Sequence, residues 1–230
     1  MLIRHTLLLT LLLCGAAGAQ ADDGEKSRFR VGLTAGTLGI GPEISYRFSD
    51  YLGVRGNATF LSLSRSLDSN DITYDAKLKL QSGGAMLDIY PFKGGFRVSG
   101  GLRLNGNLAR GVGQPNDGSG FAINGNEYTA AEIGTLRAET EIRNTAPSLT
   151  IGYGGGLSRG FVFGVEAGIL FQGSVEVGKL STSGLCAGTA PPQNCATLAG
   201  DLDAERRSVN EDISKYNVWP ILQLSVGYRF

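Results

Sequence analysis

The chain has a single histidine, His5, and it lies close to the N-terminus. Hydrolases with a serine or cysteine nucleophile use an imidazole as general base, so a nucleophile elsewhere in the chain would lack that partner. Carboxylate pairs can also do acid–base chemistry, but no matched pair stands out in the sequence. We therefore expect no enzyme activity and no cofactor, and an enzyme is the least favoured class of function.

Charged residues recur inside segments whose other side chains alternate between apolar and small or polar. Glu43, Arg55, Asp88, Arg103 and Glu166 each lie near the middle of such a segment. If one face of each strand points into a closed barrel, these charges converge on its interior. We expect a salt-bridge network, because buried charges are costly unless they are paired. The alternative is that these groups line a narrow water-filled path. The same alternation predicts further inward charges at Arg30, Arg47, Lys77, Lys79, Arg97 and Arg229.

Cys186 and Cys195 flank the dipeptide Pro191-Pro192 in a long polar segment. The even number of cysteines after the first 21 residues and the signs of export described below predict a disulfide between them. Closing so short a loop stabilises it by roughly 2–3 kcal/mol on the entropic model. The spacing is not the Cys-x-x-Cys of redox catalysis, and two cysteines without histidine do not make a zinc site. We expect a structural disulfide and no metal.

The bulk composition excludes several classes of protein. Lys and Arg together number 21, as do Asp and Glu, so no basic excess points to nucleic acid. The 35 glycines follow no Gly-X-Y period, which excludes a collagen. Glycine mixed with alternating apolar residues suits closely curved strands. The chain is predicted to be all-β.

Residues 1–21 have the features of a signal peptide. Arg4 and His5 are followed by the apolar stretch 7–13 and then by small residues, which predicts cleavage after Ala19 or Ala21. Residues 22–230 are then the mature domain. A lipoprotein anchored at Cys14 is the alternative, but the preceding Leu13 is larger than the residue that normally stands there.

The last strand carries the clearest structural pattern. Val218, Pro220, Leu222, Leu224, Val226, Tyr228 and Phe230 alternate with Trp219, Ile221, Gln223, Ser225, Gly227 and Arg229. A period of two places one set outward and the other inward. Similar alternation occurs over residues 29–35, 40–48, 52–60, 74–92, 96–104, 149–153 and 161–171, with changes of phase at Gly36–Gly39 and Gly83-Gly84. The mature chain has no run of 18 or so apolar residues, so it lacks a membrane helix, and each strand is near the 10 or so residues that a tilted strand needs to cross a bilayer.

The predicted connections differ in length. Residues 49–50, 93–95 and 158–160 make short turns, whereas 64–73, 110–144 and 173–217 are long. Within the long ones, Asn124-Gly125 predicts a small hairpin over Ala122–Tyr128, and Asp201–Tyr216 is either a short helix or a solvated segment. Alternation of this kind predicts an eight-stranded antiparallel transmembrane β-barrel with short periplasmic turns and long extracellular loops.

Several short motifs resemble those of small bacterial outer-membrane barrels of the OmpA/OmpX type, and most nearly those of CarO-like proteobacterial barrels. The motifs are Gly36–Glu43, Tyr90-Pro91-Phe92, Gly168–Gly173 and the closing Gly227-Tyr228-Arg229-Phe230. The resemblance implies that Tyr228 and Phe230 are recognised by the outer-membrane assembly machinery. It carries over no catalytic residue.

We therefore expect an exported protein of the bacterial outer membrane, in contact with its lipids. The first functional hypothesis is a non-enzymatic structural or surface-interaction protein, with a partner outside the cell that the sequence does not identify. The alternative is a narrow porin-like channel for small solutes, because CarO-like proteins are associated with small-solute uptake. Fold does not decide between these functions.

Overall fold

The computed structural model describes residues 26–68, 72–116, 119–154, 156–189 and 191–230, so the predicted signal peptide lies outside the described residues. Eight strands form a closed antiparallel ring in the order β4-β3-β2-β1-β13-β11-β10-β5, and pairing of β4 with β5 completes it. This confirms the predicted eight-stranded antiparallel barrel. The ring strands are β1 (Phe29–Gly36), β2 (Gly39–Tyr46), β3 (Leu52–Asp68), β4 (Ile72–Ile89), β5 (Phe96–Asn105), β10 (Thr145–Tyr153), β11 (Gly160–Leu170) and β13 (Trp219–Arg229).

The two faces of the ring strands differ as the alternation predicts. On β13, Leu222 and Leu224 are exposed on the outside, whereas Ile221 and Gln223 are buried inside. The β1–β2 hairpin has a two-residue turn, with Gly36 paired to Gly39, whose φ of 104° suits glycine. The predicted change of phase at these glycines is therefore a tight hairpin.

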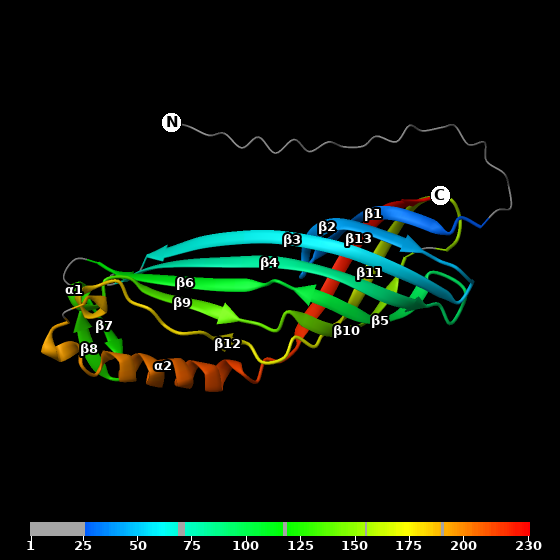
Figure 1. Cartoon of the computed structure of the whole chain (residues 1–230). Helices are drawn as coiled ribbons and strands as arrows, with labels where there is room; N and C mark the ends of the chain where they lie inside the picture. Colours follow the sequence, from blue (N-terminus) through cyan, green and yellow to red (C-terminus); the bar gives the residue numbers. More distant parts are fainter. Residues whose placement is uncertain (1–25, 69–71, 117–118, 155, 190) are drawn as a thin grey trace, which may run out of the picture.

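One end of the barrel, here called the turn end, carries the short connections β2–β3, β4–β5 and β10–β11. The start of the first strand, β1, and the end of the last strand, β13, also lie at this end, and the Phe230 amide donates to the Phe29 carbonyl over 2.9 Å. At the opposite end β3 and β4 run on beyond the ring, which makes the molecule elongated (Figure 1).

The prediction of a loop over residues 64–73 is wrong. β3 and β4 remain paired as far as Leu67 with Tyr74 and Asp68 with Thr73. Ser62, Ser64 and Ser66 lie on the outer face of β3 and Leu61, Leu63 and Leu67 on the inner face, so the period of two continues through this segment. The predicted phase change at Gly83-Gly84 is also wrong, because the pairing of β4 with β3 is unbroken there.

The remaining elements assemble on this long hairpin and form, with its outer part (Leu61–Leu80), the region here called the extension. β6 pairs with β4, β9 with β6 and β12 with β9. The segments 110–144 and 173–217 are thus partly regular rather than simple loops (Figure 1). The elements are β6 (Leu108–Pro115), β7 (Gly120–Ile123), β8 (Asn126–Thr129), α1 (Ala130–Ile133), β9 (Leu136–Glu141), β12 (Glu176–Val177), the 3-10 turns Leu185–Ala187 and Gln193–Cys195, and α2 (Leu198–Ile213).

The extension has its own small apolar core at its tip. The β7–β8 hairpin turns through Asn124 and Gly125, both with positive φ, which confirms the hairpin predicted from this dipeptide. Helix α2 is also present, and it begins three residues before the predicted Asp201. Cys186 and Cys195 form the expected disulfide beside this core. The buried core residues are Phe121, Ile123, Tyr128, Ile133 and Leu198.

None of the helices in the described part of the chain is long and apolar enough to cross a lipid bilayer.

Candidate functional site

A network of charged side chains fills the middle of the barrel. Arg55 lies at its centre and is 3% exposed. Its guanidinium donates to both carboxylate oxygens of Asp88, each over 3.2 Å, to Glu43 over 3.3 Å and to Glu166. These four residues come from β3, β4, β2 and β11, so one arginine connects strands on different sides of the ring.

Two further arginines complete this lumen network. Arg30 donates to Glu43 over 2.7 Å, and Arg97 donates to Glu166 over 3.0 Å. Three arginines therefore face three carboxylates, since Asp88 is the third acid. Equal numbers of buried charges, joined by charge-assisted hydrogen bonds, are what a dry interior needs to hold ions.

Arg103, the fifth residue predicted for the network, lies in a separate layer nearer the extension. It donates to the Ser82 hydroxyl over 2.9 Å and to the Asn57 amide oxygen over 2.8 Å. In the described ranges no carboxylate forms an ion pair with it. The sequence predicted the mid-barrel charges from the position of each residue along its strand, which included Arg103 and left out Arg30 and Arg97. The strands are tilted, so side chains from different positions along their strands lie at one level of the barrel.

Both ends of the lumen are closed by side chains. At the extension end Leu38, Leu170 and Ile221 are almost fully buried in one cluster, with Trp219 packed against it. The turn that carries Leu38 is held by the Thr59 hydroxyl, which donates to the Leu38 carbonyl over 2.7 Å. We call this cluster the apolar plug.

At the turn end, Arg47 closes the lumen. Its guanidinium lies 3.8 Å from the centre of the Tyr90 ring and donates to the carbonyls of Gly94 and Lys93 over 2.9 and 2.8 Å. A cation on an aromatic face with its donors satisfied by backbone is a well-fixed arrangement. The lumen is therefore packed along its length by the apolar plug, the layer of Arg103, the lumen network and Arg47 with Tyr90.

Some buried polar atoms of the lumen lack a partner. They include Nε of Arg30, Nε of Arg229 and both polar atoms of the Gln223 side-chain amide, none of which has a hydrogen bond within the described residues. Buried polar groups without a protein partner are commonly hydrated. These atoms are the positions at which water molecules would bind inside the lumen.

Lys77 and Lys79, predicted to point inward, lie on the outer face. The unbroken register of β4 puts them on the same face as Leu87, while Leu78 and Leu80 share the inner face with Asp88. The prediction failed because it allowed a change of phase at Gly83-Gly84. Lys77 and Lys79 therefore belong to the surface of the extension and not to the lumen.

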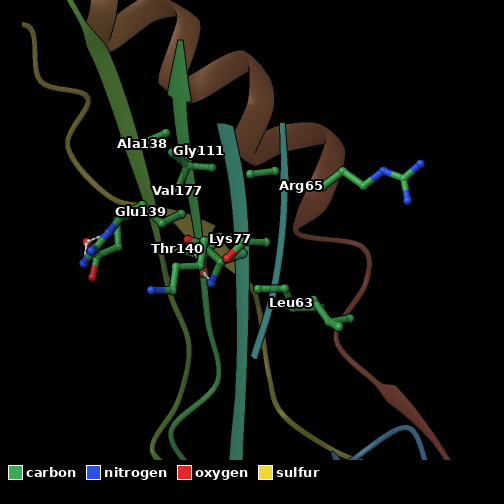
Figure 2. A pocket seen from close by; sticks show the side chains of 13 residues that line it. Leu63, Arg65, Lys77, Gly111, Ala138, Glu139, Thr140 and Val177 are labelled. Carbon is green, nitrogen blue, oxygen red and sulfur yellow. Dashed lines mark hydrogen bonds and ion pairs between the residues drawn. The ribbon is translucent and has the colours of Figure 1, made fainter. Parts of the chain in front are cut away.

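The inner face of the extension sheet forms a groove with a volume of about 570 Å³. Leu63 and Arg65 project on one side of the strands and Glu139 on the other (Figure 2). Register places Arg65, Ala76, Gly111 and Ala138 in one row across β3, β4, β6 and β9. The side chains that line the inner face are Leu63, Arg65, Ala76, Leu78, Ala109, Ala138, Thr140 and Val177.

Helix α2 is attached to the rest of the extension through polar contacts at both ends. Near its C-terminus, the Asn210 amide pairs with the backbone of Val177 in β12 over 2.7 and 3.2 Å. Near its N-terminus, buried Asp201 accepts from the amides of Asn124 and Asn126 over 3.0 and 2.9 Å and from the Tyr128 hydroxyl. The hydrogen bonds from Asn124, Tyr128 and Asn126 lower the pKa of Asp201.

The C-terminal aromatic residues form a cluster outside the turn end. Tyr228 lies with its ring 5.0 Å from that of Phe230 and 5.5 Å from that of Phe161. Phe29 is 6.3 Å from Phe230. Tyr228 and Phe230 thus share the outer face at the closing seam of the barrel.

In the described ranges no group of three or more histidine, cysteine or acidic side chains is arranged to hold a metal ion.

No protein family profile matches the chain, and no curated protein matches it by sequence. Solved structures that share its fold include two proteins named CarO and CarO2. One is CarO of Acinetobacter baumannii, with 19% identity and a TM-score of 0.54, matched over 87% of this chain and 97% of that one. The other is CarO2 of the same organism, with 18% identity and a TM-score of 0.57, matched over 88% and 98%. The likeness extends over nearly the whole of both proteins, and the chain has the fold of a CarO-like β-barrel.

Proposed function

We propose that the chain is an integral outer-membrane protein with its turn end in the periplasm and its extension outside the cell. The outer face of the ring supports this, because it exposes large apolar side chains all round: Leu33, Leu87, Leu102, Ile151 and Leu224 are between 46% and 67% exposed. Such a belt is unfavourable in water and suited to acyl chains. The signal peptide expected over residues 1–21, cleaved after Ala19 or Ala21, provides the route of export.

Polarity on the outer face changes where the extension begins. Above Phe60 on β3 the outward residues are Ser62 and Ser64, and β4 carries Lys77 and Lys79. The outward residues of both strands thus change from apolar to polar or charged without a break in the strand. This change supports an upper membrane boundary at this level. Tyr228 and Phe230 would be read by the assembly machinery before the barrel enters the lipid.

Cell fractionation and gel mobility test this location. We expect the processed chain in the outer-membrane fraction, and a different mobility in detergent gels for boiled and unboiled samples. A processed chain found free in the periplasm, with no affinity for detergent, would overturn the proposal.

We further propose a non-enzymatic surface-interaction role, in which the barrel is an anchor and the extension is the functional part. The observation that carries this is Arg55, which binds Asp88, Glu43 and Glu166 at once and so fills the middle of the lumen. An eight-stranded ring has an interior only wide enough for side chains. With the apolar plug above and Arg47 below, the barrel supports attachment rather than transport.

Conductance measured across planar bilayers tests the closed lumen. The refolded barrel should give no discrete channels. Removing the apolar plug with Leu38→Gly and Trp219→Ala should still leave the bilayer silent, because the lumen network remains. Regular unitary currents from the unaltered protein would contradict the role as an anchor.

A narrow channel is the second candidate, and the unpaired buried atoms of Arg30, Gln223 and Arg229 favour it. They give water a series of partners along the lumen. Arg47, Arg103 and Arg229 are arginines beyond the balanced network, so such a channel would prefer anions. Small anion-selective currents that change in Arg103→Leu or Glu166→Leu would support it.

A further inference from the structure

We propose that the groove of the extension binds a free single-chain carboxylate of the fatty-acid type, with its tail on the inner face of the sheet and its carboxylate at Arg65. The inference rests on the proposed surface role, and it names the ligand of the extension. The argument uses the lining of the groove, the open space in it and the charge at its rim.

The lining suits an alkyl chain. Leu63, Leu78 and Val177 provide large apolar side chains, and Ala76 and Ala138 leave the middle of the row shallow. Leu63 is 53% exposed, although it lies on the face that is buried within the ring. The volume of about 570 Å³ falls within the range of small-molecule pockets, roughly 300–1,000 Å³.

Space is open at the centre of the row. A Cβ atom built on Gly111 meets no heavy atom within 4 Å, and Gly111 has no positive φ that would explain the glycine. Neither a turn nor a close backbone approach therefore requires glycine there. The space above it is large enough to be filled by a side chain, or by a ligand.

Charge at the groove selects an anion. Lys77, Arg110 and Glu139 also border the groove, but the register places their side chains on the outer face of the sheet, where Arg110 and Glu139 pair with each other over 2.8 Å. Arg65 shares the inner face with Leu63, it is exposed, and it has no acidic partner in the described part of the chain. A guanidinium next to an apolar surface binds a carboxylate through two parallel hydrogen bonds.

Titration calorimetry of the refolded, full barrel in nanodiscs tests the proposal. The probe is dodecanoate below its micellar concentration, with dodecanol as the uncharged analogue. Gly111→Phe should abolish the binding of both, because the ring occupies the groove. Arg65→Gln should weaken dodecanoate by about tenfold, as expected for one charge-assisted contact, and leave dodecanol unchanged. Lys79→Gln removes the same charge from the outer face and should change nothing.

Three results would overturn the proposal. The first is that dodecanoate shows no saturable binding to the unaltered protein. The second is that dodecanoate and dodecanol bind equally and Arg65→Gln has no effect. The third is that the Gly111→Phe variant binds both probes as the unaltered protein does. Equal heat from empty nanodiscs would assign the signal to bilayer lipid and would therefore count as the first of these results. Gel mobility of each variant shows that the barrel is folded. Conductance and fractionation report separately on the proposed function, so the two proposals can fail independently.

Discussion

The lower and upper halves of the β3–β4 hairpin have the same backbone register and opposite chemistry. In the ring, the inner face carries buried Arg55 and Asp88, and the outer face carries exposed Val54 and Leu87. In the extension, the inner face carries Leu63 and Leu78 with the single exposed charge of Arg65 on β3, and the outer face carries serine and lysine. The comparison shows that the surroundings of each face, and not the hydrogen bonding of the strand, determine which side is polar.

The change of polarity occurs within a few residues. Phe60 on the outer face is 54% exposed, the next outward residue is Ser62, and on the inner face Leu80 is 5% exposed. In the proposed membrane location, the ring below this level is surrounded by lipid, which favours pairing of charges inside it. The extension above this level is then surrounded by water, which favours charge on its outer face. Each prediction below alters one half and uses the other as its control.

The largest effect is expected for Arg55→Leu in the lumen network. Asp88 loses its arginine, and Glu43 and Glu166 each lose one of two cations, so the barrel should lose about 3–5 kcal/mol of unfolding free energy. Urea unfolding in lipid vesicles measures the loss. Lys77→Leu, on the outer face of the extension, should change stability by less than about 0.5 kcal/mol. Similar losses for both variants would show that the lumen is solvated.

A charge introduced on the outer face should lower the unfolding free energy by an amount that depends on its position along the barrel axis. Leu224→Arg, near the middle of β13, should destabilise the barrel by about 2–4 kcal/mol, as expected for arginine at the bilayer midplane. Ser64→Arg lies on the same kind of face above Phe60 and should be close to neutral. The same unfolding assay serves for both. If Leu224→Arg were tolerated as well as Ser64→Arg, the proposed membrane boundary would be wrong.

The smallest effect is the response of the extension to pH. Hydrogen bonds from Asn124, Tyr128 and Asn126 lower the pKa of Asp201, so its contribution is fully present above the ordinary aspartate pKa of about 3.9 and is lost as pH falls through the lowered value. Near-UV circular dichroism should therefore change in acid as Tyr128 loses its acceptor. The change should be absent from Asp201→Asn, and the barrel should keep its gel mobility throughout.

Much of the fold was predictable because a β-strand repeats every two residues. The alternation on β13 identified the kind of strand that forms the ring. The short turns at 49–50, 93–95 and 158–160 identified the end of the barrel that carries the short connections. The outer part of β3, Leu61–Asp68, was missed because both of its faces are exposed or mixed, whereas the alternation from Tyr74 onward did place the outer part of β4 in a strand. The β6, β9 and β12 strands have no strong pattern of their own. β6 pairs with β4, β9 with β6 and β12 with β9, so the sheet that grows outward from β4 determines them.

The candidate site was only partly predictable. The residue types of the lumen charges follow from sequence, but their contacts depend on the tilt of the strands, which brings Arg30 and Arg97 to the level of Arg55 and leaves Arg103 apart. The groove had no signal in sequence. Its residues Leu63, Ala76, Gly111 and Ala138 come from four strands, and only the sheet places them in one row.

The uninterrupted pairing of β3 and β4 has a mechanical consequence. From Leu61 to Asp68 the two strands continue for roughly 25 Å beyond the ring without a break in their pairing. The described part of the hairpin has no flexible joint between barrel and extension, so a force applied at Tyr74 is carried along hydrogen-bonded strands to the turn-end residues Leu52 and Ile89. A ligand bound as proposed to the extension would therefore be held at a fixed distance from the barrel and in a fixed orientation.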